Sequence, residues 1–266
     1  MLAFELAERQ VASGEGPATL NFIIVGGGPT GVELAGTLAE ISRRVLADEF
    51  QSIDPKSTRI ILLEGGPRIL PAYPEDLSRS AEEQLQQLGV EVHTSAMVTA
   101  VEAAAVRIGQ TRLPAAVILW AAGVAASPLG KKLGAPTDRV GRVLINPDLS
   151  IPGHPEVFVI GDLASLKDEH GKMVPGVAPA AMQQGVAAAR NIENDLEGRP
   201  RRNFHYFNKG NLATIGRAAA VAEFGKIHIS GFVAWLSWLF IHIFFSHRIP
   251  QPHHCADPVG LVLPYV

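Results

Sequence analysis

The sequence is poor in the residues that would point to several common classes of protein. It holds a single cysteine, Cys255, among 266 residues. Neither a disulfide framework nor a redox-active cysteine pair can therefore form within the chain, which excludes a disulfide reductase. Charged residues make up only 18% and the formal net charge is -3, so the sequence gives no basis for nucleic-acid binding. The hydrophobic fraction of 47% is typical of a globular protein rather than a disordered one.

Long hydrophobic runs are also scarce. Residues 1–10 have the pattern of an amphipathic helix and lack the apolar core of a signal peptide. The exception is Ile229–Ser246, which contains no Asp, Glu, Lys or Arg. This run lies at the lower edge of the roughly 18 to 20 residues that cross a bilayer. It predicts a buried helix, a spanning helix or a helix lying in the lipid interface, and the three alternatives stay open.

The first half of the chain alternates between short apolar runs and helical patterns. This order predicts an α/β fold with a doubly wound parallel sheet. A helix after Gly31 has an apolar stripe of Leu34, Leu38, Ile41 and Val45, and a helix opened by Pro74 has one of Leu77, Ala81, Leu85 and Leu88. The expected strands of the main sheet are Asn21–Val25, Arg59–Leu63, Val90–His93 and Val117–Trp120, with antiparallel ribbon strands at Val98–Val101 and Val106–Ile108.

A second segment begins where the composition turns to that of a loop, around Asn146–Pro155. Beyond it we expect a buried strand at Val157–Ile160 and a helix from about Ala180 to Leu196. Two short strands, Leu212–Ile215 and Ala219–Phe224, then precede the apolar run. The predicted domains are 1–145, 146–205 and 206–266.

The most informative motif is a glycine-rich turn between the first expected strand and the first helix. In Gly26-x-Gly28-x-x-Gly31 the first glycine permits a tight turn, the second lets the backbone approach a pyrophosphate and the third lets the helix pack on the strand. The helix N-terminus supplies N–H groups and a positive dipole end. Glu64, at the end of the second strand, is placed to bind a ribose. A carboxylate there favours NADH over NADPH, because it repels a 2′-phosphate.

Glu33 follows the last glycine by two residues. A carboxylate in the first turn of a helix is stabilised by the helix dipole, which alone explains its presence. A role facing the nicotinamide end of the dinucleotide is the alternative. The sequence does not choose between these interpretations.

A second strand end carries a Gly-Asp pair, at Gly161 and Asp162. The carboxylate of Asp162 could bind the hydroxyl groups of a polyol. Many strands end in a Gly-Asp turn, so the pair gains weight only because it follows a complete dinucleotide-binding unit.

Taken with these motifs, the chain resembles type II NADH:quinone oxidoreductases, within the flavoprotein superfamily that has two dinucleotide-binding domains. The resemblance covers nearly the whole chain in the family's order. The matching segments are IIVGGGPTGVELAG (Ile23–Gly36), LPAYPEDLS (Leu70–Ser78), LGVEV (Leu88–Val92), LWAAGV (Leu119–Val124), VFVIGDLA (Val157–Ala164), PGVAPAAMQQG (Pro175–Gly185) and KGNLATIGRAAAVAEFG (Lys209–Gly225).

The resemblance also implies roles for individual residues. Gly161 and Asp162 would hold the ribityl-phosphate part of FAD, with Ala164 of the same segment as a further cofactor contact. Gly123 would lie near the nicotinamide. Gln183 and Gln184 would line the quinone pocket, with Gln183 and Glu33 as the catalytic candidates. Without the resemblance, the two glutamines would be interpreted as an ordinary first turn of a helix.

The chain departs from the family pattern in three places. The family has an N-terminal GxGxxG unit for the adenosine diphosphate of FAD, and this chain carries only the turn at Gly26. It is therefore expected to be truncated before Met1 and to hold FAD weakly or not at all. Pro179 stands where the family often has a glutamine, and residues 247–266 stop resembling the family.

The histidine-rich tail does not predict a metal site. His253, His254, Cys255 and Asp257 lie too close together for a structural zinc site, and the sequence offers no second pair of ligands. We therefore expect no bound metal and interpret this tail as disordered.

The function predicted from the sequence is transfer of electrons from NADH through FAD to a membrane quinone, without proton pumping. The resemblance implies peripheral attachment to the cytoplasmic face of the inner membrane through the apolar C-terminal segment, with a second copy of the chain as a further candidate partner. Two alternatives stay open. One is an NADH-binding fragment without catalysis, and the other is a related flavin reductase acting on a protein acceptor.

Overall fold

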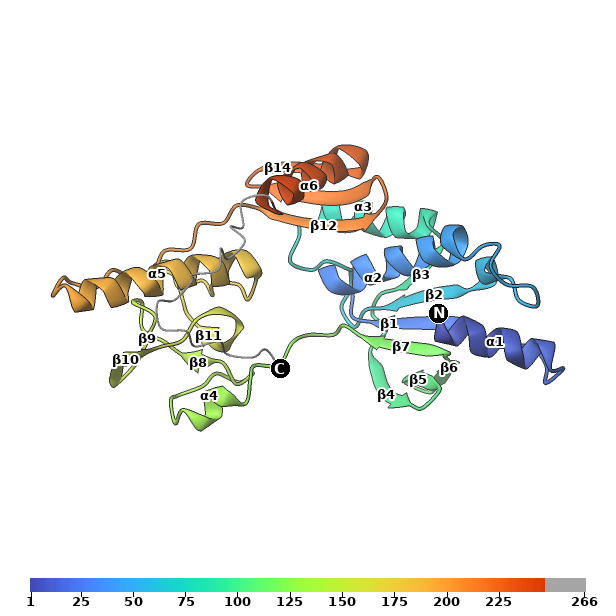
Figure 1. Cartoon of the computed structure of the whole chain (residues 1–266), viewed down its shortest axis with the longest axis horizontal. Helices are drawn as coiled ribbons and strands as arrows, with labels where there is room; N and C mark the ends of the chain where they lie inside the picture. Colours follow the sequence, from blue (N-terminus) through green and yellow to red (C-terminus); the bar gives the residue numbers. More distant parts are fainter. Residues whose placement is uncertain (247–266) are drawn as a thin grey trace, which may run out of the picture. The chain divides into compact units, whose positions relative to one another are not determined.

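The computed structural model describes residues 1–246, which form two compact units (Figure 1). The first unit contains Met1–Ala122 and the described part of the chain from Gly210 to Ser246, and the second contains Gly123–Lys209. The sequence-predicted boundary after residue 145 lies within the second unit, and most of the predicted third domain lies in the first unit. Each unit has its own hydrophobic core.

A parallel four-stranded sheet in the order β3-β2-β1-β7 forms the centre of the first unit. The α/β class, the parallel sheet and the four strand ranges predicted for it are confirmed. The N-terminal amphipathic helix is also confirmed. The elements around the sheet are α1 (Leu2–Ala12), β1 (Asn21–Val25), α2 (Pro29–Glu40), the π-helix η1 (Ile41–Val45), η2 (Pro55–Ser57), β2 (Arg59–Leu63), α3 (Glu75–Gln87), β3 (Val90–His93) and β7 (Val117–Trp120).

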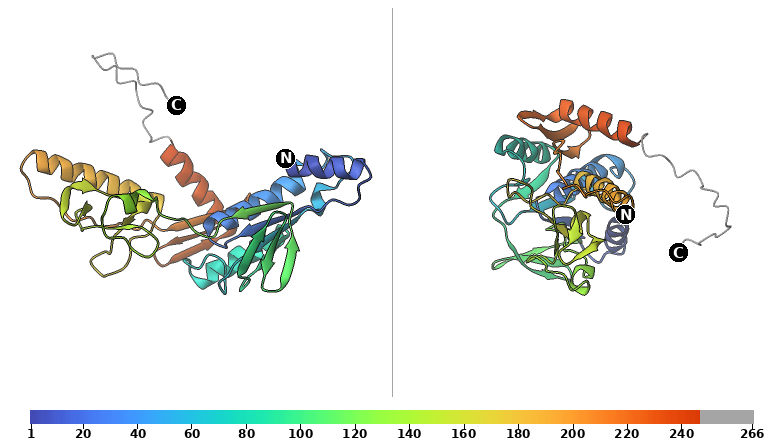
Figure 2. Two further views of the ribbon diagram at one scale, coloured as in Figure 1. Left: turned by 90° about the horizontal axis from the view of Figure 1, so that it is seen from below. Right: turned by 90° about the vertical axis from the view of Figure 1, so that its left-hand side faces the viewer.

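Among residues 1–246, helices cover only one face of this sheet (Figures 1 and 2). The other face packs against an antiparallel ribbon of three strands, β4 (Val98–Glu102), β5 (Ala105–Ile108) and β6 (Thr111–Pro114). The sheet is therefore not doubly wound by helices as predicted. Two tight turns let this short stretch fold back on itself, so that Val106 and Leu113 cover the strands in place of a helix.

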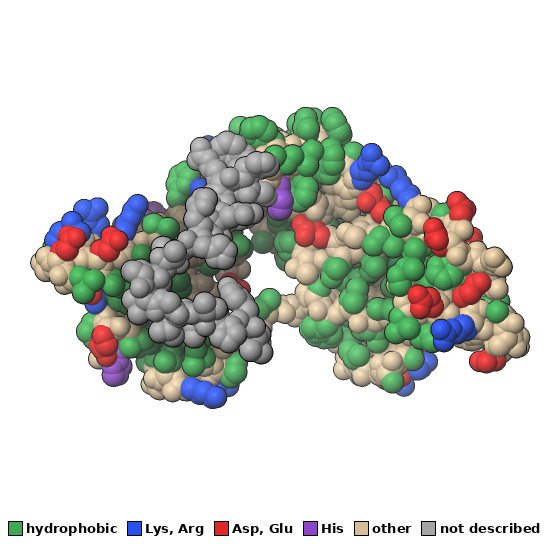
Figure 3. Space-filling view, in the orientation of Figure 1, with side chains coloured by type: hydrophobic (Ala, Val, Ile, Leu, Met, Phe, Trp, Pro, Cys, Tyr) green, Lys and Arg blue, Asp and Glu red, His purple; other side chains and the backbone are tan. Residues whose placement is uncertain are grey.

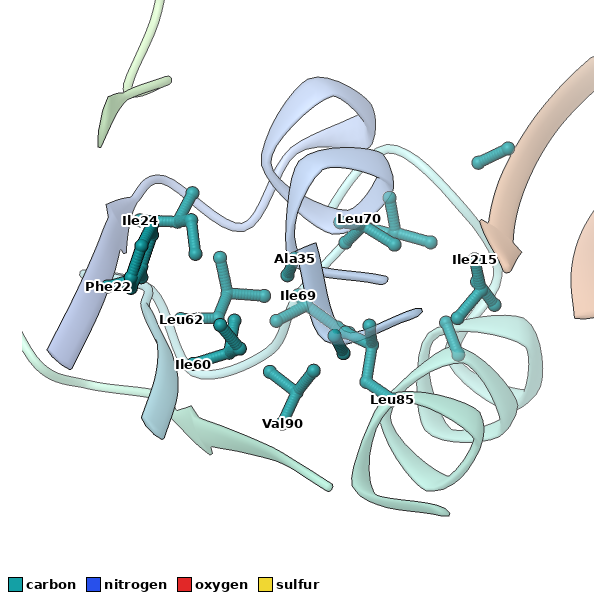
Figure 4. Close-up of a cluster of buried hydrophobic side chains, with 14 of the residues drawn as sticks. Phe22, Ile24, Ala35, Ile60, Leu62, Ile69, Leu70, Leu85, Val90 and Ile215 are labelled. Atoms are coloured by element: carbon teal, nitrogen blue, oxygen red, sulfur yellow. The ribbon is translucent and has the colours of Figure 1, made fainter. Parts of the chain in front are cut away.

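The core between the sheet and the helices is built from branched aliphatic side chains (Figure 4). Helix α2 meets this core through Val32, Ala35 and Ala39, and the expected stripe contributes less, because Leu34 and Val45 are exposed. Small residues allow the helix to approach its neighbours closely. On α3 the expected stripe is buried at Leu77, Ala81 and Leu85. The labelled side chains in Figure 4 are Phe22, Ile24, Ala35, Ile60, Leu62, Ile69, Leu70, Leu85, Val90 and Ile215.

The chain returns to the first unit as an antiparallel sheet followed by one helix. The strands are β12 (Asn211–Gly216), β13 (Ala219–Phe224) and β14 (Ile227–Ser230), and the helix is α6 (Gly231–Ser246). Alternation along β13 sends Val221 to the core shared with α2 and α3, and Ala220 and Ala222 to α6. The start of the apolar run is strand rather than helix, because Ile229 and Ser230 pair with β13.

The second unit has one long helix over small sheets. Its elements are α4 (Leu129–Lys132), β8 (Val143–Leu144), β9 (Ser150–Ile151), β10 (His154–Phe158), η3 (Gly161–Leu163), β11 (Ala164–Ser165) and α5 (Ala178–Leu196). The strand expected at Val157–Ile160 is observed as β10, which begins and ends earlier in the sequence. It pairs with β9 in an antiparallel hairpin.

A polar cluster holds the end of α5 to the rest of the second unit. The buried Asn191 donates hydrogen bonds to the carbonyls of Asp148 and Arg202 and accepts one from the Arg202 amide. Arg201 forms ion pairs with Asp148 and Asp195 and stacks over the Phe158 ring, 4.8 Å from its centroid. These pairs raise the pKa of Arg201, chiefly through its hydrogen bond with Asp195.

Candidate dinucleotide site

The glycine-rich turn lies where β1 ends and α2 begins, at the carboxyl edge of the parallel sheet. Gly26 has a left-handed backbone with φ of 110°, and a Cβ there would lie 2.6 Å from the Ala121 carbonyl. A Cβ on Gly31 would lie 1.8 Å from the Gly26 carbonyl oxygen. At Gly28 a Cβ would meet nothing within 4 Å in the described part of the chain. The outer glycines thus allow the turn to close, and the middle one leaves open space at the helix mouth.

The carboxylate of Glu64 points into this turn. Its Oε2 accepts a hydrogen bond from the Gly27 amide at 2.6 Å, and its Oε1 accepts one from the Gly66 amide at 2.6 Å. Each carboxylate oxygen can accept a second hydrogen bond. Glu64 therefore holds two glycine backbones in place and still offers acceptors to a ribose.

The peptide of Gly27 is held from both sides. While its amide binds Glu64, its carbonyl accepts a hydrogen bond from the Leu70 amide at 2.7 Å. Leu70 is fully buried and has a left-handed backbone with φ of 47°, a conformation that a leucine seldom adopts. Sequence reasoning did not single out Leu70 beyond its place in a family segment. The turn is consequently fixed before any ligand binds.

Glu33 lies on α2 and faces β12, where its Oε1 accepts a hydrogen bond from the Thr214 amide at 3.3 Å. Its neighbour Tyr73 is buried, and this burial, together with the negative charges of Glu33 and Glu223, raises the pKa of the Tyr73 phenol to about 12. Sequence reasoning did not single out Tyr73, because the two carboxylates approach it only through the tertiary fold.

We expect alkaline pH to destabilise the first unit through Tyr73. An unfolded tyrosine ionises near pH 10, whereas the folded one keeps its proton to about pH 12. The stabilisation is present in full below pH ~10 and is lost as the pH rises to ~12, amounting to about 2 kcal/mol. Chemical denaturation at pH 8 and pH 11 should therefore show a smaller loss of stability for Tyr73→Phe than for the unsubstituted chain. An equal loss in both would contradict this assignment.

The predicted flavin residues lie together in the second unit. Gly161 has a left-handed backbone with φ of 68° and opens the short helix η3, and Asp162 is exposed. Ala164 is buried, and its amide is bound to the Gly161 carbonyl. Gly123 is exposed, with φ of 97°.

The side chains of the two predicted quinone residues form hydrogen bonds with the backbone of the second unit. Gln184 is buried, and its Oε1 accepts a hydrogen bond from the Gly161 amide at 2.6 Å. The Gln183 amide group makes two 3.0 Å hydrogen bonds with the backbone of Phe207, one as donor and one as acceptor. Both side chains thus have structural partners, and each retains further hydrogen-bonding capacity.

Among residues 1–246 no group of three or more His, Cys, Asp or Glu side chains is arranged to hold a metal ion. His253, His254, Cys255 and Asp257 lie outside the described residues.

The parallel sheet, the glycine turn and the acidic residue at the end of β2 define a dinucleotide-binding domain. The chain belongs to the pyridine nucleotide-disulphide oxidoreductase family, whose model matches residues 4–185.

Within this family, the chain is similar to type II NADH:quinone oxidoreductases, which confirms the resemblance predicted from the sequence. It is 44% identical over 255 residues to the Mycobacterium tuberculosis type II NADH:quinone oxidoreductase NdhA, covering 91% of this chain and 53% of the relative. It is 42% identical to the Ndh protein of the same organism, covering 91% and 54%. The chain spans about half the length of these curated relatives.

The fold is also similar to that of a solved structure, NDH2 from Plasmodium falciparum in complex with NADH. The TM-score is 0.78 at 18% sequence identity, covering 90% of this chain and 66% of the solved one. At this level of identity the comparison supports the fold alone.

Proposed function

We propose that the first unit binds NADH and that the chain forms the NADH-binding part of a type II NADH:quinone oxidoreductase. The observation that carries the proposal is the Glu64 carboxylate, directed at the mouth of α2 beside the open space at Gly28. The diphosphate would lie on the amides of the first turn of α2, and the adenosine ribose would bind Glu64. The mycobacterial relatives carry NADH and quinone in their names.

The chain's own residues bind and orient in this reaction. Bound FAD would supply the chemistry of hydride transfer from NADH and of onward electron transfer to a quinone. Gly31 and Gly26 keep α2 and β1 close enough for the turn to present its amides, and Gly123 would adjoin the nicotinamide. We assign Glu33 to the nicotinamide and quinone side of the site.

The residues present fit only part of FAD. Gly161 and Asp162 present a left-handed turn and an exposed carboxylate, which suit the ribityl-phosphate portion. The adenosine diphosphate portion needs a glycine-rich turn of its own, and the sequence has only one such turn, at Gly26. The second candidate function is binding of NADH by the chain alone, without catalysis. Tight stoichiometric binding of added FAD would contradict that alternative.

The quinone assignment is supported by the relatives and by the surface around Gln183. The helix start before it is exposed from Pro175 to Pro179, and Met182 and Val186 are exposed apolar residues. Gln183 would donate its remaining N–H to the quinone, and Gln184 would support the turn at Gly161.

Attachment to a membrane surface would take place through α6. No helix among residues 1–246 is long and apolar enough to traverse a bilayer. The exposed large apolar side chains of α6 recur at helical spacing on one face, and Figure 3 shows hydrophobic side chains gathered over this helix. We propose peripheral attachment at the cytoplasmic face of the inner membrane, with a second copy of the chain as a further partner. The outward residues are Phe232, Val233, Leu236, Phe240 and Ile243.

The NADH assignment is tested by Glu64→Gln. The amide nitrogen of the new side chain would face a backbone N–H, and the charge that repels a 2′-phosphate would be lost. We expect NADH to bind about ten- to a hundredfold more weakly, as for loss of one hydrogen bond to a charged group. The preference for NADH over NADPH should shrink in calorimetric titrations of both. Glu75→Gln changes an exposed glutamate of α3 and serves as the matched control.

A merely structural role for Glu64 would weaken both nucleotides equally and leave their ratio unchanged. Absence of saturable NADH binding to the unsubstituted chain would overturn the proposed function itself.

The membrane assignment is tested by placing a charge on the outward face of α6. Phe240→Glu should abolish co-sedimentation of the chain with lipid vesicles, because a carboxylate is costly to bury in the interface. Leu196→Glu, which adds the same charge at an exposed leucine of α5, controls for added charge. Equal sedimentation of the Phe240→Glu chain and the unsubstituted chain would contradict attachment through this face.

A further inference from the structure

The loop that follows β3 is joined to the loop that follows β2. The Ala96 amide donates to the Glu64 carbonyl at 2.8 Å, and the Ser95 amide donates to the Gly66 carbonyl at 2.7 Å. Ser95 takes a left-handed backbone with φ of 54°. These contacts fix the backbone on both sides of the ribose-binding carboxylate.

Met97 follows this loop and lays its side chain over Gly65. A Cβ on Gly65 would lie 2.7 Å from the Met97 methyl carbon and 3.2 Å from its sulfur. The Met97 residue is nevertheless 64% exposed. Gly65 thus leaves room for the thioether of Met97. This side chain lies beside Glu64, and much of the Met97 surface is open to a ligand.

The order of the strands assigns each part of a dinucleotide to its own loop. In the sheet order β3-β2-β1, the loop after β1 carries Gly28, the end of β2 carries Glu64, and the loop after β3 leads to Met97. Gly28 and Met97 therefore flank Glu64 on opposite sides. In adenosine diphosphate the ribose joins the diphosphate through one carbon and the purine through another, so the two extend away from the sugar in different directions.

We propose that Met97 is the platform for the adenine ring, a positioning residue for the nucleotide; this rests on the proposed function, because Glu64 must hold the ribose. A polarisable thioether binds an aromatic ring favourably, with the sulfur about 5 Å from the ring. The flexible side chain also adapts to the ring's position. Met97 contributes affinity through the adenine half alone.

The experiment uses the full 266-residue chain with ADP-ribose and NADH as probes. We expect Met97→Ala to weaken ADP-ribose binding about three- to tenfold, the range for sulfur–aromatic contact and lost apolar area. Val45→Ala, which truncates a side chain of 65% exposure at the end of η1, should bind as the unsubstituted chain does. Isothermal calorimetry measures all three proteins.

Methyl NMR gives a second readout that does not depend on a substitution. With 13C-methyl methionine, ADP-ribose should shift the Met97 resonance through the purine ring current and leave those of Met173 and Met182 in place. Unchanged affinity of Met97→Ala, or an unmoved Met97 methyl in a saturated chain, would overturn the adenine platform alone. A chain that binds neither probe would instead overturn the proposed function.

Discussion

Gly28→Ala should weaken NADH binding by about a hundredfold while leaving the fold intact. A Cβ at this position meets no atom of residues 1–246 within 4 Å, and the backbone has an ordinary φ of -71°. The added methyl group would instead occupy the space through which the diphosphate approaches the turn. Moving the diphosphate away from the turn would lose about two hydrogen bonds to a charged group, or roughly 3 kcal/mol of binding free energy. Calorimetry measures the affinity for NADH, and thermal unfolding of the same preparation measures the stability of the fold.

Gly31→Ala provides the contrast to this variant. Its Cβ would lie 1.8 Å from a backbone oxygen of Gly26, so both stability and binding should fall. A Gly28→Ala chain that binds NADH normally would show that no diphosphate rests on this turn.

Gly36→Ala should destabilise the first unit by about 3 kcal/mol or more, beyond the usual cost of one added methyl group in a packed core. A Cβ on Gly36 would lie 1.5 Å from the carbonyl oxygen of Ile215. That obstacle is backbone, so no change of rotamer relieves it, and α2 must move away from β12. We expect the urea midpoint of unfolding to fall and NADH binding to weaken with it, since α2 carries the glycine turn.

Ala substitution of Thr37, which is exposed on the same helix, is the matched control. Thr37→Ala should unfold like the unsubstituted chain. A Gly36→Ala chain of unchanged stability would mean that α2 and β12 do not pack as described.

The four strands of the parallel sheet were predictable from local properties. β1, β2 and β7 are short, mainly apolar runs bounded by turn residues, and β3 alternates apolar and polar residues after Gly89. The glycine turn and Glu64 were predictable for a related reason, since the chemistry of the ligand fixes their order along the chain. The apolar face of α3 also followed from spacing alone.

Long-range pairing was not predictable in the same way. Nothing in the sequence around Leu70 indicates that its amide binds the Gly27 carbonyl. Nothing around Met97 indicates that its side chain lies over Gly65. The stripe of large residues on α2 misled for a physical reason, because the helix approaches its neighbours through small residues. The structural partners of Gln183 and Gln184 likewise arise from residues at least 23 positions away.

The alanine-rich strand β13 has a further consequence for geometry. Its side chains at Ala220 and Ala222 make a thin spacer between α6 and the layer that contains α2. With one packing layer of ~10 Å on each side of a sheet, the two helices would lie on the order of 20 Å apart. The glycine turn would therefore lie at a fixed distance and orientation from any surface that α6 binds. Lengthening the side chains of this spacer would change that distance without altering any nucleotide contact.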